Sequence, residues 1–346
     1  MKEQDGMPVR VGINGFGRIG RLFLRAAKSA GKNFNFVAIN DLADTNQMAL
    51  LLRYDSIHGP YPGKVEAEDG DLVVDNDRIQ TRKVTDKREG DPFPFPWGEV
   101  GADVVVEATG IFRRIAELER HLAAGAKRVV LTVPCKDPLE ATVVLGVNDG
   151  ILKPSHRIIS NSSCTTNCAA PVAKVLNDLY GIREGFLTTV HAYTNDQRLF
   201  DHLHKDARRG RMAPMNIVPT STGAAKALGM VIPDLKGKLE GLAFRVPVPS
   251  GSVVDLTVIT KKRPAVEEIH AAMRQAAAGP MRGILQVTDD PIVSADVIGN
   301  SHSSIYDSQL TQVPQEDLVK VVAWYDNEWG YAMRVVELVE KVAALG

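Results

Sequence analysis

The stretch that decides the fold is Val9–Gly20, VRVGINGFGRIG. Its first half alternates toward a buried strand, and its second half is a glycine-rich turn. The residues that follow, RLFLRAAKSA, place apolar side chains at helical spacing, and Gly31 predicts the end of that helix. A second strand is predicted over Phe34–Ile39, so the segment forms one strand–helix–strand crossover, which is the unit of a parallel sheet.

The glycines of the turn have the G-x-G-x-x-G pattern of dinucleotide-binding folds. Gly15 permits the tight turn, Gly17 lets the backbone approach a pyrophosphate, and Gly20 allows close packing of helix and strand. Free N–H groups at the helix start favour phosphate groups. Asp41 ends the second strand, where its carboxylate would accept hydrogen bonds from ribose hydroxyls and repel a 2′-phosphate. The pattern predicts an NAD site, with a turn that binds nothing as the alternative.

The first half of the chain continues this alternation of strands and helices. We predict three further strands, one helix, and a charged segment of inserted antiparallel hairpins. These are the strands Val104–Glu107, Lys127–Val133 and Arg157–Ser160, the helix Ile115–Ala124, and the hairpins within Tyr61–Trp97.

The second half has longer strands separated by helices, which is typical of an α+β domain. The predicted strands are Leu187–His191, Gly241–Pro247 and Ser252–Thr260, and the predicted helices are Ala169–Leu179 and Val266–Ala277. The fold class is therefore α/β. A Rossmann-type parallel-sheet NAD domain over 1–162, completed by a C-terminal helix over 328–346, precedes an α+β catalytic domain with a mostly antiparallel sheet over 163–327.

Composition limits the classes of protein. A chain of 346 residues, 44% hydrophobic and 24% charged, suggests two globular domains. No apolar run approaches the roughly 18–20 residues that cross a membrane, and the polar start MKEQDGMP is unlike a secretory signal. Three cysteines fit a reducing, cytoplasmic compartment. With 42 acidic and 41 basic residues, neither nucleic acid nor a membrane surface is an expected partner.

A cysteine and a histidine form the second candidate site. Cys164 stands in SNSSCTTNC, between a predicted strand and a predicted helix, and a helix start stabilises a thiolate. Cys168 lies one turn further on and is expected to belong to the core. His191 ends an apolar strand and is the candidate base. The alternative is a buried thiol and an unrelated buried histidine; the cysteine spacing suits neither a C-x-x-C redox pair nor a metal site.

Several residues predict phosphate binding. Thr220-Ser221-Thr222-Gly223 precedes a helical stretch, so that hydroxyls and N–H groups converge there. Thr194 follows the strand that ends at His191. Arg245 is alone in an apolar strand, where it needs either a ligand phosphate or an internal carboxylate. The basic stretch Lys205–Arg211 either steers an anionic substrate or is an ordinary solvated loop.

Six motifs in order make the chain resemble the family of phosphorylating glyceraldehyde-3-phosphate dehydrogenases, from about Val9 to Val339. They are INGFGRIGR, SNSSCTTNC, TTVHAYTNDQR, PTSTGAAKA, FRVPVPSGSVVDL and WYDNEWGY. The resemblance implies an NAD-dependent enzyme of glycolysis. Its substrates are D-glyceraldehyde 3-phosphate and inorganic phosphate, and its product is 1,3-bisphosphoglycerate. It also implies a homotetramer in which the region of Lys205–Arg211 runs along a subunit interface.

The resemblance also implies roles for single residues. Cys164 is the nucleophile that passes through a hemithioacetal and a thioester, and His191 is its base. The dinucleotide site takes Gly15, Gly17, Arg18, Ile19, Gly20, Asp41, Thr109, Phe112, Thr132, Asn327 and Tyr331. The substrate and phosphate sites take Ser163, Thr165, Thr194, Arg209, Thr222, Gly223 and Arg245.

The chain departs from the family pattern at several positions. Ser162 stands where the family has its usual small residue before the Ser-Cys pair, and Thr132 replaces a serine near the nicotinamide. Leu203 replaces a proline common in NAD-using members. The segment that usually contacts adenine is altered to Glu89–Pro92, with Arg88 as the candidate substitute.

Three alternatives remain beside this function. An enzyme of the same superfamily could act on erythrose 4-phosphate, although the chain keeps the TNDQ and PTSTGAAKA segments from which that branch departs. A non-catalytic NAD-binding scaffold would have no use for the thiol and imidazole of Cys164 and His191. A cysteine hydrolase would have no use for the dinucleotide pattern.

Overall fold

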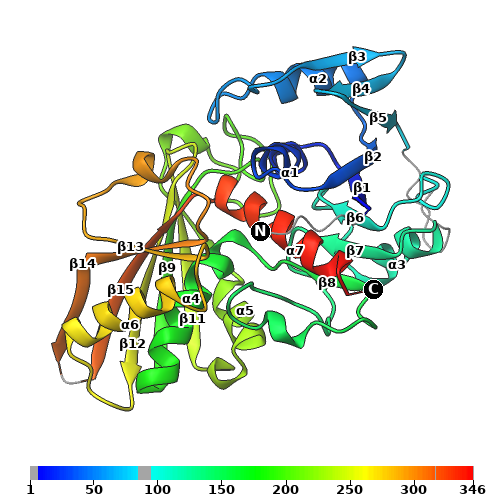
Figure 1. Cartoon of the computed structure of the whole chain (residues 1–346). Helices are drawn as coiled ribbons and strands as arrows, with labels where there is room; N and C mark the ends of the chain where they lie inside the picture. Colours follow the sequence, from blue (N-terminus) through cyan, green and yellow to red (C-terminus); the bar gives the residue numbers. More distant parts are fainter. Residues whose placement is uncertain (1–6, 85–94, 316, 346) are drawn as a thin grey trace. The chain divides into compact units, whose positions relative to one another are not determined.

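A computed structural model describes residues 7–84, 95–315 and 317–345 (Figure 1). The chain divides into two compact units. The first contains Met1–Thr142, Ile151–Ser162 and Ala332–Gly346, and the second contains Val143–Gly150 and Ser163–Tyr331.

The first unit contains an eight-stranded sheet in the order β3-β4-β5-β2-β1-β6-β7-β8. Its six strands from β5 to β8 are parallel, as the crossover pattern predicts. The strands are β1 (Val9–Asn14), β2 (Phe34–Asn40), β3 (Val65–Glu68), β4 (Asp71–Val74), β5 (Asp77–Arg82), β6 (Val104–Glu107), β7 (Arg128–Leu131) and β8 (Ile158–Ser160).

Continuous apolar runs explain the centre of this sheet, because strands covered on both faces need no polar alternation. All four residues of β6 and of β7 are buried. The helices of the unit are α1 (Arg18–Ser29), α2 (Thr45–Arg53) and α3 (Ile115–Ala123), together with the residues of α7 (Trp329–Ala343) from Ala332 onward.

The hairpins expected within Tyr61–Trp97 are confirmed, because β3 pairs with β4 and β4 with β5 in antiparallel fashion. The structure adds a parallel pairing of β5 with β2, which extends the main sheet. Part of the proline-rich PFPFPW segment lies outside the described residues, as do Arg88 and Glu89–Pro92. Its last residues form core, since Phe95 and the fully buried Trp97 stack at 4.1 Å.

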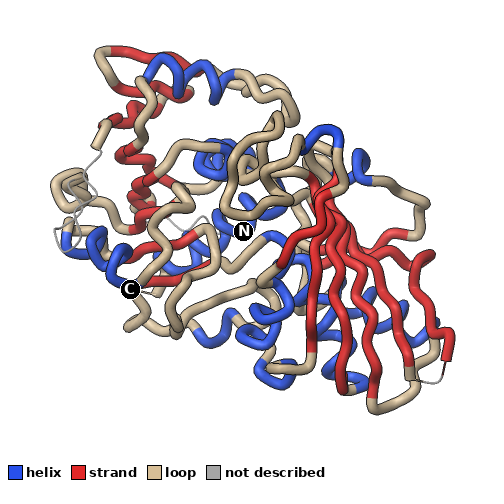
Figure 2. Tube along the Cα trace, turned by 180° about the vertical axis from the view of Figure 1, so that it is seen from behind, coloured by secondary structure: helices blue, strands red, loops and turns tan. Residues whose placement is uncertain are grey.

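The second unit contains a seven-stranded sheet in the order β10-β11-β9-β12-β15-β14-β13. Figure 2 shows these strands side by side, with helices behind them. The sheet is mostly antiparallel, as predicted, with parallel pairings of β11 with β9 and of β13 with β14. The strands are β9 (Ile182–Ala192), β10 (Val218–Ser221), β11 (Leu239–Val246), β12 (Ser252–Thr260), β13 (Leu285–Thr288), β14 (Ser304–Gln315) and β15 (Leu318–Tyr325).

The helices of this unit are α4 (Cys164–Tyr180), α5 (Ala224–Val231) and α6 (Val266–Ala278). Short 3-10 turns occur at Asp149–Ile151, Ala213–Met215, Pro233–Leu235 and Ser294–Val297. Helix α4 begins at Cys164, ahead of the predicted start at Ala169, because the Ser163 side chain caps its first turn. Among the residues that the structure describes, we find no helix with the length and apolar character needed to cross a membrane.

Candidate active site

Cys164 and His191 lie in hydrogen-bond contact in the second unit. Cys164 is the first residue of α4, and His191 is the penultimate residue of β9. The Sγ atom of Cys164 lies 3.4 Å from Nε2 of His191. The structure therefore pairs the two residues that the sequence analysis singled out separately.

Two groups contact Nδ1 of His191, the ring nitrogen that does not face the thiol. Nδ1 lies 2.7 Å from the carbonyl oxygen of Ala192, and the Arg245 guanidinium contacts the same nitrogen. The carbonyl can only accept a proton from Nδ1, whereas the guanidinium can only donate one to it, so the two contacts favour opposite tautomers. The tautomer protonated at Nδ1 leaves the lone pair of Nε2 facing Cys164. This is the tautomer that a general base requires.

Both members of the pair are held neutral. Burial raises the pKa of the Cys164 thiol, and it outweighs the positive charge of Arg245 and the hydrogen bonds from Thr165. Burial and the Arg245 charge lower the pKa of His191 to about 3. Burial thus opposes the stabilisation of a thiolate that the helix start is expected to provide. The imidazole in hydrogen-bond contact is the candidate acceptor for the thiol proton.

The start of α4 is ordered by hydroxyl groups. The Ser163 Oγ accepts the N–H of Thr166 at 3.1 Å. Thr165 shares a hydrogen bond of 2.9 Å with the Tyr325 hydroxyl, which also lies 3.0 Å from Oγ1 of Thr189. The Tyr325 ring packs edge-on against the imidazole of His191, with centroids 5.8 Å apart. Ser163 and Thr165 thus flank Cys164 in the chain, and Thr165 is joined through Tyr325 to the surroundings of His191.

Arg245 lies beside the same pair, on β11 in register with His191. Its Nη1 donates to the Ala192 carbonyl at 3.1 Å. Within the described part of the chain, no carboxylate lies at ion-pair distance from this guanidinium. Of the two expected partners, an internal carboxylate is thus not found among the described residues, and a ligand phosphate stays a prediction.

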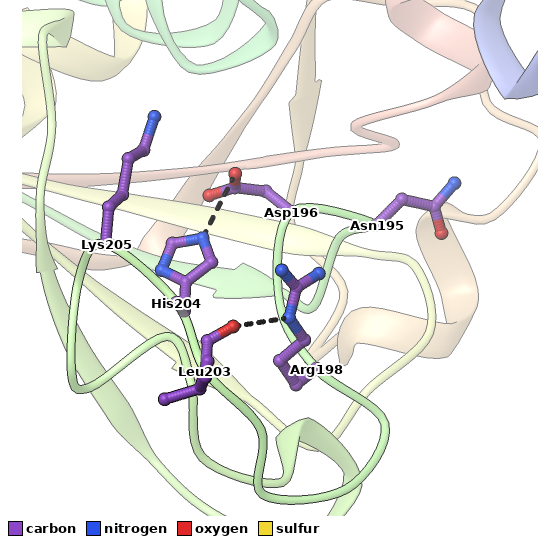
Figure 3. A pocket seen from close by; sticks show the side chains of 6 residues that line it. All are labelled: Asn195, Asp196, Arg198, Leu203, His204 and Lys205. Carbon is purple, nitrogen blue, oxygen red and sulfur yellow. Dashed lines mark hydrogen bonds and ion pairs between the residues drawn. The ribbon is translucent and has the colours of Figure 1, made fainter.

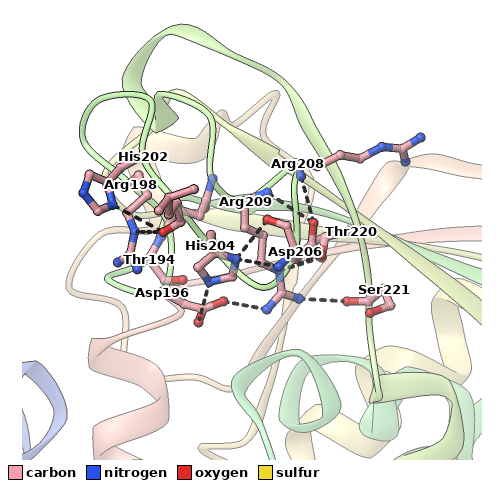
Figure 4. A network of polar contacts seen from close by, with 12 residues as sticks. Thr194, Asp196, Arg198, His202, His204, Asp206, Arg208, Arg209, Thr220 and Ser221 are labelled. Atoms are coloured by element: carbon pink, nitrogen blue, oxygen red, sulfur yellow. Dashed lines mark hydrogen bonds and ion pairs between the residues drawn. The ribbon is translucent and has the colours of Figure 1, made fainter.

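Arg209 is held by a polar network around the segment from Thr194 to Ser221 (Figure 4). Its Nη1 lies 2.5 Å from Asp196, and its Nε donates to Thr220 at 2.7 Å. His204 lies 3.7 Å from the other oxygen of Asp196. Arg209 is therefore fixed in orientation, whereas the N–H of Thr194 bonds only locally, to Gln197 at 3.3 Å.

Thr222 and Gly223 open helix α5. The Thr222 hydroxyl accepts the N–H of Ala224 at 3.2 Å, and Gly223 is the residue at which the helix is capped. A Cβ at Gly223 would meet nothing within 4 Å, so its backbone borders open space. This is the arrangement that binds anions at a helix start.

Asn327 and Tyr331, two of the expected dinucleotide residues, belong to the second unit and are buried there. Ser252 donates to the amide oxygen of Asn327 at 2.8 Å and accepts the N–H of Ala192 at 3.0 Å. The bond from Ser252 fixes which end of the Asn327 amide is the oxygen.

The glycine turn belongs to the first unit and has the expected geometry. Gly15 has a φ of 93°, and a Cβ there would lie 2.7 Å from the N atom of Thr109. A Cβ at Gly20 would lie 2.1 Å from the Gly15 carbonyl oxygen, so only glycine permits this approach of helix and turn. At Gly17 a Cβ would meet nothing within 4 Å.

Asp41 lies at the end of the second strand, as predicted, and its carboxylate also accepts hydrogen bonds from the backbone. One carboxylate oxygen accepts the N–H of Phe16 at 2.6 Å, and the other accepts the N–H of Ala43 at 3.0 Å. A carboxylate offers about four acceptor positions, so capacity for ribose hydroxyls remains. Asp41 thus orders the glycine turn in addition to any ligand contact.

The other expected dinucleotide residues also belong to the first unit. The Arg18 side chain pairs with Asp55 at 2.7 Å, and Ile19 is half-buried in the first turn of α1. Thr132 donates its hydroxyl to the backbone oxygen of Glu107 at 3.0 Å. Thr109 donates its N–H to the Glu107 carboxylate at 2.9 Å.

Ser162 is a departure from the family pattern, and its surroundings limit the size of the side chain at this position. Its φ of 57° lies in the left-handed region, which strains any residue other than glycine, and its side chain is fully buried. A small side chain is therefore required there.

Two residues beside the site, Tyr325 and Ser252, were not predicted from the sequence. Both lie in quoted motifs, WYDNEWGY and FRVPVPSGSVVDL, but their roles depend on contacts with residues distant in sequence.

The described residues contain no cluster of three His, Cys, Asp or Glu side chains that could hold a metal ion. Cys168, as expected, is buried core. Its Sγ contacts the carbonyl oxygen of Ala323 at 3.5 Å, and burial raises the pKa of its thiol.

Comparisons with known proteins agree with this geometry. The profile of the glyceraldehyde 3-phosphate dehydrogenase NAD binding domain matches residues 9–115, and that of the C-terminal domain matches residues 163–327. A glyceraldehyde-3-phosphate dehydrogenase of Mycolicibacterium smegmatis is 54% identical over 342 residues, covering 97% of this chain and 99% of the relative. A glyceraldehyde-3-phosphate dehydrogenase of Mycobacterium leprae is 53% identical over 338 residues, covering 96% and 98%. Glyceraldehyde-3-phosphate dehydrogenase 2 of Streptomyces arenae is 52% identical over 335 residues, also covering 96% and 98%.

A dinucleotide-binding α/β unit in one chain with an α+β unit that carries a thiol–imidazole pair defines an NAD-dependent oxidoreductase. The chain belongs to the glyceraldehyde-3-phosphate dehydrogenase family. The resemblance found in the sequence is thereby confirmed, together with NAD as cofactor and the fold class of each half.

Proposed function

We propose that this protein converts D-glyceraldehyde 3-phosphate, NAD and inorganic phosphate into 1,3-bisphosphoglycerate and NADH. The observation that carries the proposal is the 3.4 Å contact between Cys164 and His191, with the Arg245 guanidinium against the same imidazole. A nucleophile, its base and a cation for a phosphorylated substrate then occur in one place. The domains that we propose are an NAD domain over 1–162 with 328–346 and a catalytic domain over 163–327. The compact units differ from these bounds at 143–150 and 328–331, which belong to the second unit.

The first step forms a bond between Cys164 and the substrate. The thiol proton passes to Nε2 of His191, and the thiolate attacks the aldehyde carbon. The imidazolium returns this proton to the former carbonyl oxygen, giving a neutral hemithioacetal. Thr194 and Arg245 would hold the substrate phosphate, which sets the aldehyde carbon against Sγ.

Oxidation follows at the same carbon. NAD, when bound, supplies the acceptor for the hydride that leaves this carbon. His191 takes the hydroxyl proton again as the hydride leaves, so that a thioester remains on Cys164. General-base assistance of this kind is worth on the order of 10²–10⁴-fold in rate.

The first unit fits the cofactor. The open space at Gly17 leaves room for a pyrophosphate, and Gly17, the N-cap residue of α1, has no side chain that could cap the helix. Residues proposed to hold NAD are Gly15, Gly17, Arg18, Ile19, Gly20, Asp41, Thr109, Phe112, Thr132, Asn327 and Tyr331.

Phosphorolysis completes the cycle. A phosphate oxygen attacks the thioester carbon, the C–S bond breaks, and the thiolate of Cys164 is released. The imidazolium of His191 returns its proton to this thiolate, and the proton of the attacking hydrogen phosphate passes to water. Ser163, Thr165, Arg209, Thr222 and Gly223 would bind this inorganic phosphate, because they supply hydroxyl, guanidinium and helix-start N–H donors.

NADH formation, followed by absorbance with and without inorganic phosphate, tests the proposal directly. We expect rapid turnover of glyceraldehyde 3-phosphate that depends on phosphate. Turnover without phosphate dependence would indicate a hydrolytic enzyme and remove the second anion site. Bound NAD without turnover would favour the scaffold, and preference for erythrose 4-phosphate would favour the related dehydrogenase.

We also infer a homotetramer in the cytoplasm. The segment from Leu199 to Ile217 exposes several large apolar side chains, and Leu203 is 87% exposed. The same segment borders a hollow of about 510 Å³ lined by Asn195, Asp196, Arg198, Leu203, His204 and Lys205 (Figure 3). Apolar side chains gathered in one exposed loop favour burial against another subunit. Sedimentation equilibrium of the purified protein tests this, and a monomer would contradict it.

A further inference from the structure

A row of buried polar residues ends three adjacent strands of the first unit. Asn14 of β1 is in register with Asn40 of β2 and with Glu107 of β6. All three side chains are at most 5% exposed. They lie at the carboxyl edge of a parallel sheet, which is where ligands bind in open α/β folds.

Glu107 is the centre of this row. Its Oε2 accepts Nδ2–H of Asn14 at 2.5 Å and lies 3.1 Å from Nε2 of His121. Asn14 in turn accepts Nδ2–H of Asn40 at 2.8 Å. The other oxygen of Glu107 accepts both the N–H and the hydroxyl of Thr109. A buried carboxylate surrounded by donors is stabilised as an acceptor and holds those donors in position.

Trp97 determines the tautomer of His121. The indole Nε1–H is a donor only, and it lies 3.0 Å from Nδ1 of His121. Nδ1 must therefore be unprotonated, and Nε2 carries the proton that His121 donates to Glu107. The Trp97–His121–Glu107 chain thus has one self-consistent direction of hydrogen bonding.

This chain ends on residues assigned to the dinucleotide site. Glu107 fixes the N–H of Thr109, whose backbone is the surface against which the turn at Gly15 packs. The His121 ring packs edge-on against Phe112, with centroids 6.1 Å apart. The backbone also ties the row together, since the N–H of Gly15 bonds to Asn40 at 2.8 Å.

We propose that Glu107, held by His121, is a positioning residue of the NAD site. Its carboxylate fixes Thr109 and, through it, the wall of the glycine turn, and His121 orients Phe112. The inference rests on the assignment of these residues to NAD in the proposed function. Glu107 need not touch the cofactor, because it acts through groups that do.

Four variants test this role. In Glu107→Gln, one carboxylate oxygen becomes an NH₂ group. In either orientation of the amide, this NH₂ group faces N–H or O–H donors to which it cannot bond. His121→Phe keeps a ring but removes both polar atoms. His121→Gln is the conservative variant, because its amide oxygen and NH₂ can replace Nδ1 and Nε2–H. Val129→Ala opens a cavity in β7 and serves as the control for general destabilisation.

The measurements are the Kd for NAD by calorimetry, KM for NAD, kcat at saturating NAD, and Tm. We expect Glu107→Gln and His121→Phe to raise Kd and KM for NAD about tenfold, with kcat retained. His121→Gln should keep an affinity close to that of the wild type. Val129→Ala should lower Tm without changing Kd.

Unchanged NAD affinity in both Glu107→Gln and His121→Phe would overturn the proposal, as would an equal loss in Val129→Ala. If Glu107→Gln does not fold, the comparison of His121→Phe with His121→Gln tests the inference, because both variants keep the Glu107 carboxylate. A wild-type protein that binds NAD in this pattern but does not oxidise glyceraldehyde 3-phosphate would refute the proposed function and leave this inference standing. If Glu107→Gln binds NAD and turns over like the wild type, the proposed function stands and this inference is refuted.

Discussion

Nε2 of His191 lies 3.4 Å from Sγ of Cys164, although one residue is on a strand and the other begins a helix. The contact makes Nε2 the candidate acceptor for the thiol proton. Because the pKa of the thiol is raised and that of the imidazole is lowered to about 3, the resting pair is uncharged.

Replacement of the nucleophile is the most direct test of this arrangement. Cys164→Ser should reduce kcat by roughly 10⁴-fold, because a hydroxyl beside a neutral imidazole is a far weaker nucleophile than a thiol. NAD binding, measured by calorimetry, should persist. Cys168→Ser is the control and should retain turnover, since Cys168 is buried against Ala323. Retained turnover in Cys164→Ser would refute the assignment.

His191→Gln should lower kcat by about 10²–10⁴-fold, because it removes the proton acceptor at Nε2. Its affinity for NAD should stay close to that of the wild type. Alkylation of Cys164 by iodoacetamide at pH 7 should also slow, since the thiol loses its base. An unchanged alkylation rate would show that the imidazole does not act on this thiol.

Arg245→Ala should raise KM for glyceraldehyde 3-phosphate far more than KM for unphosphorylated glyceraldehyde. The reason is that the guanidinium has no carboxylate partner at ion-pair distance in the described chain, so its charge is available to a phosphate. Steady-state kinetics with both aldehydes measure the difference. Equal losses for the two aldehydes would identify Arg245 as a structural residue that orients His191.

Asp41→Ala should narrow the preference for NAD over NADP. Its carboxylate would repel a 2′-phosphate, and the variant removes that repulsion. Because Asp41 also accepts the N–H of Phe16 at 2.6 Å, we expect kcat/KM for NAD to fall as well. The ratio of kcat/KM for the two cofactors is the measurement that decides, and an unchanged ratio would contradict the prediction.

Asp55→Asn should destabilise the protein in a pH-dependent way. Burial acts to raise the pKa of Asp55, but the N–H groups of Ile57 and His58 and the charge of Arg18 outweigh it and lower this pKa below its ordinary value. A carboxyl group whose pKa is lower in the folded state stabilises the fold at pH values above its pKa in the unfolded state. This stabilisation is lost as the pH falls through its pKa in the folded state. At pH 7 we expect a loss of about 1–3 kcal/mol in unfolding free energy.

Urea unfolding at several pH values checks this prediction. The difference between wild type and Asp55→Asn should be constant from pH 7 to about pH 5 and shrink below about pH 4. Glu340→Gln is the control, because its pair with Lys32 is half exposed and should contribute little. A gap that does not narrow in acid would mean that the Asp55 charge is not the stabilising element.

Local sequence determined much of this protein. The strands predicted over 9–14, 104–107 and 252–260 have those bounds in the structure, because each is a short apolar or alternating run between turn residues. The glycines at 15 and 20 were equally predictable, since a tight turn and a close backbone approach exclude any side chain. Six motifs were enough to indicate the family.

Tertiary structure alone decided the rest. The sequence offered Cys164 and His191 as candidates, but only the pairing of strands and the start of α4 bring them into contact. It suggested a stabilised thiolate, whereas burial raises the pKa of the thiol. The chain from Trp97 through His121 to Glu107 joins three segments that no local pattern connects. Periodicity and turn chemistry act over a few residues, whereas desolvation and side-chain pairing depend on which distant segments pack together.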